Sequence, residues 1–161
     1  MTVPLTGPLT VPLNVSTTVI AGYASLFGVR DLAGDVVMPG AFRTSLARRG
    51  AAGLAMLHQH ALANPIGVWD VAREDGTGLF VRGRIFARPP AAAHAAALVR
   101  AGALDGLSIG YVARAARSDP AGNGRILTEI DLFEVSLVSF PMLPGARLTV
   151  VRPTPDVRRA A

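Results

Sequence analysis

Serine, histidine and carboxylate side chains are the groups from which this sequence could build a hydrolytic site. Ser108 lies between two glycines in the segment DGLSIGY (105–111), which matches the G-x-S-x-G pattern of a nucleophile, although small residues of this kind also fit an ordinary turn. Because glycine has no Cβ, Gly106 and Gly110 are expected to let a substrate backbone approach the Ser108 hydroxyl. A serine activated by a nearby base attacks a carbonyl carbon and forms an acyl-enzyme. The pattern therefore predicts acyl-transfer chemistry at Ser108.

The order of elements around Ser108 excludes the α/β-hydrolase form of this motif. That form has a strand before the serine, a helix after it, and the histidine last in chain order. Here an Ala-rich predicted helix precedes Ser108, a predicted strand follows it, and the last histidine is His94. The base must therefore come from upstream of the serine.

The three histidines lie in different surroundings. His94 is inside the Ala-rich segment PAAAHAAAL (90–98), where a surface or packing role is expected. His58 and His60 lie where a predicted strand runs into a loop, a usual place for catalytic groups. Two histidines at i and i+2 of a strand also face the same way, so a metal site completed by Asp or Glu is the alternative.

A carboxylate in the segment LTEIDLFEVSLV (127–138) is the candidate third member of the site. Regular alternation places Glu134 and Ser136 on the apolar face of a strand there, and Glu129 and Asp131 on the opposite face. A carboxylate among apolar neighbours needs a partner, and a histidine N–H would serve. Backbone amides or an arginine would serve equally well.

Strands joined by hairpins, together with two helices, are expected to position these residues. The predicted strands cover residues 15–27, 36–38, 54–60, 66–72, 79–86, 107–115, 126–138 and 147–151, and the predicted helices cover 39–49 and 89–101. This order differs from alternating βαβ units. We therefore expect an α+β fold, mainly an antiparallel β-barrel or sheet of about seven strands flanked by helices.

Length and composition indicate one globular domain. The 161 residues predict a domain at 15–151 with a flexible N-terminal arm (1–14) and a flexible C-terminal tail (152–161). Half of the residues are apolar and only 17% are charged, which excludes a disordered chain. All 16 basic residues are arginines spread along the chain, which argues against a dedicated nucleic-acid patch. Cysteine is absent, so thiol catalysis is excluded, and no apolar run is long enough for a membrane span, so we expect a cytoplasmic protein.

Beyond these patterns, the chain resembles the prohead (head maturation) serine proteases of tailed phages and their relatives in gene transfer agents. The resemblance covers residues 20–150 and is carried by five blocks in family order: GYASLFG (22–28), GDVVMPGAFRTSL (34–46), HQHALANPIGVW (58–69), LVRAGALDGLSIGY (98–111) and LTEIDLFEVSLVSFPMLPGA (127–146). The family is similar in fold to the herpesvirus assembly protease, assemblin, in which a histidine, the serine and a third residue follow in that order.

Position by position, the resemblance implies Ser108 as the nucleophile and His60 as the base. Glu134 is implied as the third catalytic residue, with Asp131 and Glu129 as alternatives. No cofactor is implied.

The resemblance also implies what this site acts on. The expected substrate is the scaffold region or N-terminal segment of the major capsid protein, and the protease itself, inside the assembling procapsid in the host cytoplasm. The resemblance to assemblin implies a homodimer or an activity coupled to assembly, and neither a membrane nor a specific nucleic acid is an expected partner.

Two positions depart from the family pattern: His58 replaces a usual aromatic residue, and Ala61 replaces a common aspartate. The alternatives are a non-catalytic capsid-assembly or scaffold module and a metal-dependent hydrolase that uses His58 and His60.

Overall fold

The expected strands and helices are all present, with shifted ends, in a computed structural model that describes residues 17–122 and 124–151. The proposed arm (1–14) and tail (152–161) lie outside the described residues. In chain order the elements are β1 (Thr18–Leu26), β2 (Val36–Val37), α1 (Arg43–Arg49), a 3-10 turn (Ala51–Gly53), β3 (Ala55–His58), β4 (Pro65–Glu74), β5 (Gly78–Ile85), α2 (Pro90–Arg100), β6 (Gly106–Ser118), β7 (Arg125–Val138) and β8 (Leu148–Val150).

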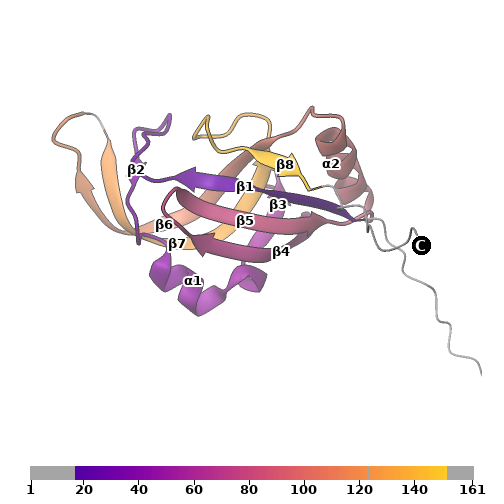
Figure 1. Cartoon of the computed structure of the whole chain (residues 1–161), viewed down its shortest axis with the longest axis horizontal. Coiled ribbons are helices and arrows are strands. Elements are labelled where there is room, and N and C mark those ends of the chain that lie inside the picture. The colour runs from indigo at the N-terminus through magenta and orange to yellow at the C-terminus, as the bar shows by residue number, and fades with distance from the viewer. Residues whose placement is uncertain (1–16, 123, 152–161) are drawn as a thin grey trace, which may run out of the picture.

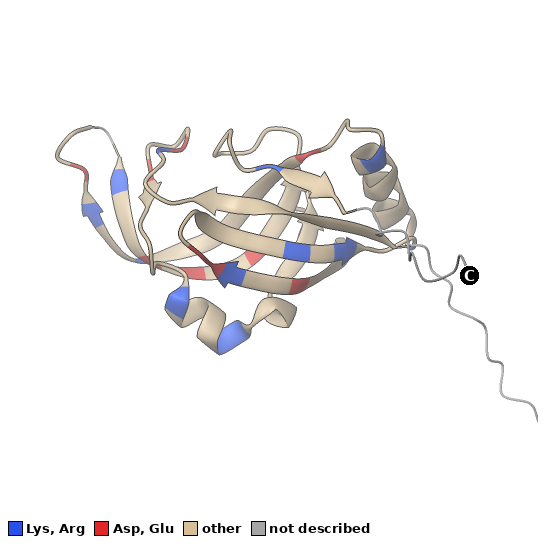
Figure 2. Ribbon diagram, in the orientation of Figure 1, with Lys and Arg blue, Asp and Glu red and all other residues tan. Residues whose placement is uncertain are grey.

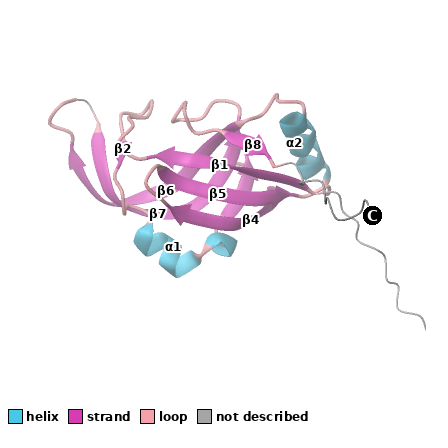
Figure 3. Cartoon of the chain, viewed as in Figure 1, coloured by secondary structure: helices cyan, strands magenta, loops and turns pink. Residues whose placement is uncertain are grey.

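One eight-stranded, mixed sheet holds the molecule together (Figure 3). Its order is β2-β7-β3-β4-β5-β1-β8, and β6 pairs with β7 as well. The hairpins β4–β5 and β6–β7 are antiparallel as expected, but β2 and β3 both run parallel to β7. The expectation of an antiparallel sheet was wrong for these two pairs because their partners are distant in the chain, and no turn signals such a pairing.

The expectation of a barrel was also wrong. The sheet curls until Gly106, at the start of β6, and Arg147, just before β8, form an isolated bridge. No continuous ladder follows this bridge among the described strands, so the sheet stays open.

Strand β7 is the central strand for the site because it has partners on both edges. On one edge β2 pairs at Val36–Val37 and β3 pairs farther along, leaving the middle of β7 without a strand partner. The entry to α1 covers this gap: the Ser45 hydroxyl donates to the Leu132 carbonyl at 3.3 Å and accepts from the Leu132 N–H at 2.9 Å. The backbone groups of β7 are thus satisfied where the sheet lacks a strand.

Helix α2 covers the other end of the sheet, as Figure 1 shows. It presents a buried stripe of small residues spaced by three or four positions: Ala92, Ala95, Ala96 and Val99. This spacing forms one face of a helix, and side chains this small let the helix lie close to the sheet. Within the described residues, no helix is long and apolar enough to cross a membrane.

Candidate active site

The position of His60 is set by a sharp turn just after β3. The strand ends at His58, and Gln59 and His60 both adopt left-handed backbone conformations, with φ of 53° and 59°. Such conformations are unfavourable for residues with a Cβ and persist where their surroundings hold them. Here the Gln59 N–H donates to the Leu137 carbonyl at 2.9 Å, and its side-chain amide donates to the Ser139 hydroxyl at 2.7 Å. The turn is therefore tied to the end of β7.

This turn brings the His60 ring to Glu134. His60 Nδ1 lies 2.6 Å from Glu134 Oε1, and the Glu134 side chain is buried while that of His60 is half exposed. The other carboxylate oxygen, Oε2, accepts a hydrogen bond from the Ser136 hydroxyl. A carboxylate held on both oxygens fixes the orientation of the imidazole, and the pairing at Nδ1 leaves Nε2 as the nitrogen that can receive a proton.

Gly110, the glycine opposite Glu134, has a structural role in the packing of the two strands. Gly110 of β6 is the cross-strand partner of Glu134, and a Cβ at position 110 would lie 2.2 Å from Glu134 Oε1. At Gly106 a Cβ would lie 2.4 Å from the Val138 carbonyl oxygen. Both glycines make room for neighbouring parts of the protein, a role that the sequence pattern did not predict.

Ser108 shares a pocket with His60. It lies on β6 opposite Ser136 and is 7% exposed. The pocket, with a volume of about 280 Å³, is lined by both Ser108 and His60. Within the described residues, no hydrogen bond joins the Ser108 hydroxyl to His60; catalytic hydrogen bonds of this kind often tighten only when substrate is bound.

The other expected histidine turns away from this pocket. The His58 ring faces His94 of α2, with 6.3 Å between the ring centroids. Burial lowers the pKa of His58, and the nearby His94 lowers it further. The strand ends at His58, so His58 and His60 do not lie on the same face of a strand as expected. The His58 ring lies near His94, and the His60 ring lies against Glu134. In the described part of the chain, no three His, Asp or Glu side chains are grouped as metal ligands.

The alternative acids lie elsewhere. Asp131 is buried against three arginines: Arg48, Arg49 and Arg114. The hydrogen bond from Arg114, followed by those from the other two, lowers the pKa of Asp131 to about 2. Glu129 lines a separate groove together with Asp131. Of the three carboxylates, Glu134 is the one paired with a histidine in the pocket that contains Ser108.

A polar cluster in the same pocket was not identified from the sequence. Arg125 binds both oxygens of the buried Asp35, and the Tyr111 hydroxyl donates to Asp35 Oδ2 at 3.0 Å. The guanidinium holds the pKa of Asp35 below its usual value, whereas burial, followed by the bond to Asp35, raises the pKa of Tyr111 to about 12. These three residues come from separate segments, and only the long ladder between β6 and β7 and the parallel pairing of β2 bring them together.

Solved structures of viral proteases share the fold that carries this pocket. The chain superimposes on the bacteriophage T4 capsid assembly protease, gp21, with a TM-score of 0.63 and 18% identity, covering 76% of this chain and 82% of that one. It matches the KSHV protease in complex with a hexapeptide phosphonate inhibitor with a TM-score of 0.56 and 15% identity, covering 85% of this chain and 66% of that one. At these identities the likeness establishes the fold alone.

The chain belongs to the caudovirus prohead serine protease family, because the model of that family matches residues 9–157. It is 35% identical over 136 residues to the prohead protease of Enterobacteria phage HK97, covering 83% of this chain and 60% of that protein. The chain thus spans less than two thirds of the length of this relative. The family resemblance drawn from the five sequence blocks is confirmed.

Proposed function

We propose that this protein is a serine endopeptidase that matures a phage-type prohead by cleaving the scaffold region or N-terminal segment of the major capsid protein. The observation that carries the proposal is the pairing of His60 with the buried Glu134 in the pocket that Ser108 lines. Family membership supports a protease, and the relatives from phages HK97 and T4 are named as a prohead protease and a capsid assembly protease.

The chemistry follows from the hydrogen bonds of the site. The Ser108 hydroxyl attacks the carbonyl carbon of the scissile peptide while its proton passes to His60 Nε2. The imidazolium that results is stabilised by the Glu134 carboxylate at Nδ1, and it then donates its proton to the leaving amine. A water molecule repeats the sequence on the acyl-enzyme, which releases the carboxylate product and restores the Ser108 hydroxyl.

The place and partners of this activity belong to the same proposal. An enzyme that matures proheads acts inside the assembling particle in the host cytoplasm, and self-cleavage and a homodimer are part of the proposed cycle. A metal-dependent reaction at His58 and His60 is disfavoured because the two rings meet different partners. Nothing in the geometry favours a non-catalytic module.

Covalent labelling and capsid processing test the proposal. A fluorophosphonate is expected to modify Ser108, as located by peptide mass spectrometry, and labelling should persist in the presence of a chelator. In cells that co-express the capsid protein, His60→Ala should abolish processing, whereas the matched variant His58→Ala should retain it. Processing that survives His60→Ala and is lost with His58→Ala would show that the wrong base has been assigned.

A further inference from the structure

Large apolar side chains are exposed in the three loops that contribute to the Ser108 pocket. We call five of them the apolar collar: Val29, Leu32, Leu62, Phe140 and Met142. The most exposed are Phe140 at 94%, Leu62 at 82% and Leu32 at 74%. Exposed apolar groups scattered singly are ordinary, but several gathered at one site mark a binding surface.

The three loops form one connected rim. The loop between β1 and β2 is joined to the loop between β7 and β8 by the Leu32 N–H, which donates to the Met142 carbonyl at 2.9 Å. The loop after β3 is joined to the loop between β7 and β8 by the hydrogen bond from the Gln59 side chain to the Ser139 hydroxyl. Val29 and Met142 also line the pocket itself. Val29 and Met142 therefore connect the apolar collar to the space in front of Ser108, and the loops that carry Leu32, Leu62 and Phe140 are bonded into the same rim.

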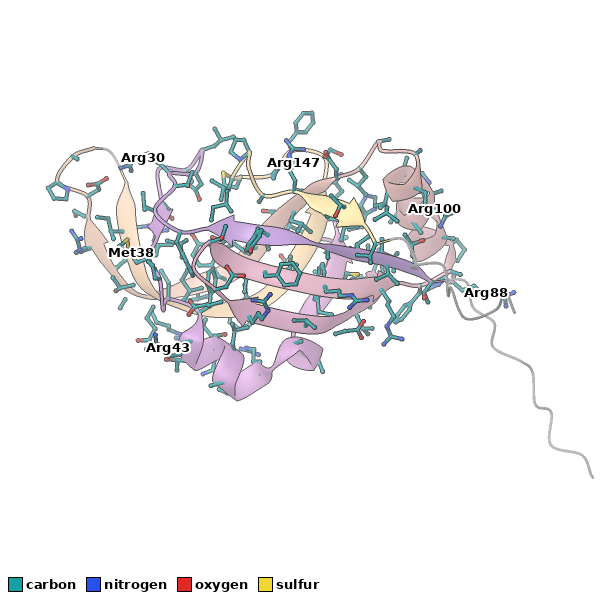
Figure 4. All side chains as sticks on the ribbon, in the orientation of Figure 1. Arg30, Met38, Arg43, Arg88, Arg100 and Arg147 are labelled. Carbon is teal, nitrogen blue, oxygen red and sulfur yellow. The ribbon has the colours of Figure 1, made fainter. Side chains whose placement is uncertain are left out.

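The collar carries little free charge. Residues 59–64 and 139–146 contain no Asp, Glu, Lys or Arg, and Figure 2 shows the loop between β7 and β8 uncharged as far as Arg147. The arginines at the borders of the collar, Arg30 and Arg147, are both labelled in Figure 4 and pair with Asp119 and Asp105. The carboxylate of Asp31, which lines the pocket next to Leu32, accepts hydrogen bonds from the backbone N–H groups of Ala33 and Asp35. A surface whose charges are already compensated offers nothing to a charged ligand and favours an uncharged, apolar one.

We propose that the apolar collar is the substrate-recognition surface of this enzyme and that it selects extended polypeptide segments with large, uncharged apolar side chains flanking the scissile bond. The proposal rests on the proposed function in one respect, since the occupant is taken to be a polypeptide because the collar adjoins the Ser108–His60 pocket. Collar side chains pack against apolar side chains of the substrate, and charged residues are rejected because the collar leaves them without partners.

The test uses a Ser108→Ala protein, so that binding is read without cleavage. The immobilised protein is incubated with a synthetic library of 12-residue peptides in which Leu, Phe, Met and Val compete at every position with Asp, Glu, Lys and Arg. Retained peptides are sequenced. We expect neighbouring positions to be enriched in the apolar residues over the charged ones by about tenfold, the scale of burying one such side chain.

Variants of the collar connect this selectivity to its residues. Leu32, Leu62 and Phe140 are exposed, so replacing all three with serine in the Ser108→Ala protein leaves the core intact. This variant should lose the enrichment, whereas the matched replacement of an exposed valine outside the collar, Val68→Ser, should keep it. Equal enrichment in the collar variant, a preference for charged peptides, or no retained peptides at all would overturn the proposal.

Two further outcomes are separable. If the serine replacements change the sedimentation of the protein from dimer to monomer and leave peptide retention unchanged, the collar binds a second copy and the proposal is wrong. If fluorophosphonate labelling of the enzyme with Ser108 intact fails while peptide selection by the collar is observed, the catalytic assignment fails and the recognition surface stands.

Discussion

The substitution Gly110→Ala tests how closely the two central strands of the site fit together. An added Cβ would lie 2.2 Å from Glu134 Oε1 and 2.7 Å from its Cδ, whereas ordinary contacts begin near 3.4 Å. The carboxylate would have to move by about 1.2 Å, and its 2.6 Å bond to His60 Nδ1 does not survive such a shift. A misplacement of about 1 Å in a catalytic group costs on the order of 10²-fold in rate, so kcat should fall by about that factor. The crowding should also lower the free energy of unfolding, by about 1–3 kcal/mol.

Cleavage of a fluorogenic peptide and urea unfolding measure the two effects, with Gly76→Ala as the matched control. A Cβ at Gly76 meets nothing within 4 Å, so this variant should keep full activity. A double-mutant cycle examines the reasoning directly, because in a Glu134→Ala background the carboxylate that Gly110→Ala displaces is gone and the substitution should have little further effect on kcat. An equal loss of activity in both backgrounds would refute the assignment of Gly110 as the residue that makes room for Glu134.

Three further predictions concern charged and hydroxyl groups, two of them near the site and one, Asp131, in the separate groove. Ser136→Ala removes one hydrogen bond to the Glu134 carboxylate, and kcat/KM should fall by about 10–100-fold, the usual range for a bond to a charged group; unchanged kinetics would contradict a positioning role. Asp131 has a folded-state pKa of about 2 against a usual 3.8, so the stability that its ionised form contributes is present above pH 3.8 and is lost as the pH falls towards 2. Asp131→Asn should therefore unfold at lower urea concentration than wild type at pH 7, and the difference should shrink between pH 4 and 2; a constant difference would show that the arginines contribute no charge-dependent stability. Asp35→Asn removes the charge that helps to raise the pKa of Tyr111, so that pKa should fall below about 12 in an NMR titration of ¹³C-labelled tyrosine, and an unchanged value would assign the whole effect to burial.

Local patterns in the sequence predicted the elements of this fold better than their pairing. Turn residues and alternation located every strand, because both signals are contained within a few neighbouring residues. The parallel pairing of β3 with β7 has no such signal, yet it is this pairing that places the turn at His60 beside the end of β7. The family resemblance, rather than any local pattern, led to the proposal that His60, Ser108 and Glu134 form one site.

The choice among the carboxylates shows a second limit of sequence patterns. Regular alternation assigned Glu134 to the buried face and Asp131 to the opposite one, but both are buried. The burial of β7 departs from alternation at Asp131, which is buried between two buried neighbours, Ile130 and Leu132. Partners from distant segments, an arginine cluster for Asp131 and a histidine for Glu134, distinguish the two residues, and such partners are set by the fold as a whole.

The parallel contact between β3 and β7 also has a consequence for the timing of biosynthesis. The ribosome synthesises His60 well before Ser108 and Glu134. These two residues lie on the hairpin β6–β7, more than forty positions downstream. Until the ribosome has extruded that hairpin and it has docked beside β3, the nascent polypeptide holds the proposed base without the proposed nucleophile. On the proposed assignment, the base and the nucleophile come together only when the ladder between β3 and β7 closes, which pairs residues as far apart in the sequence as Ala55 and Glu134.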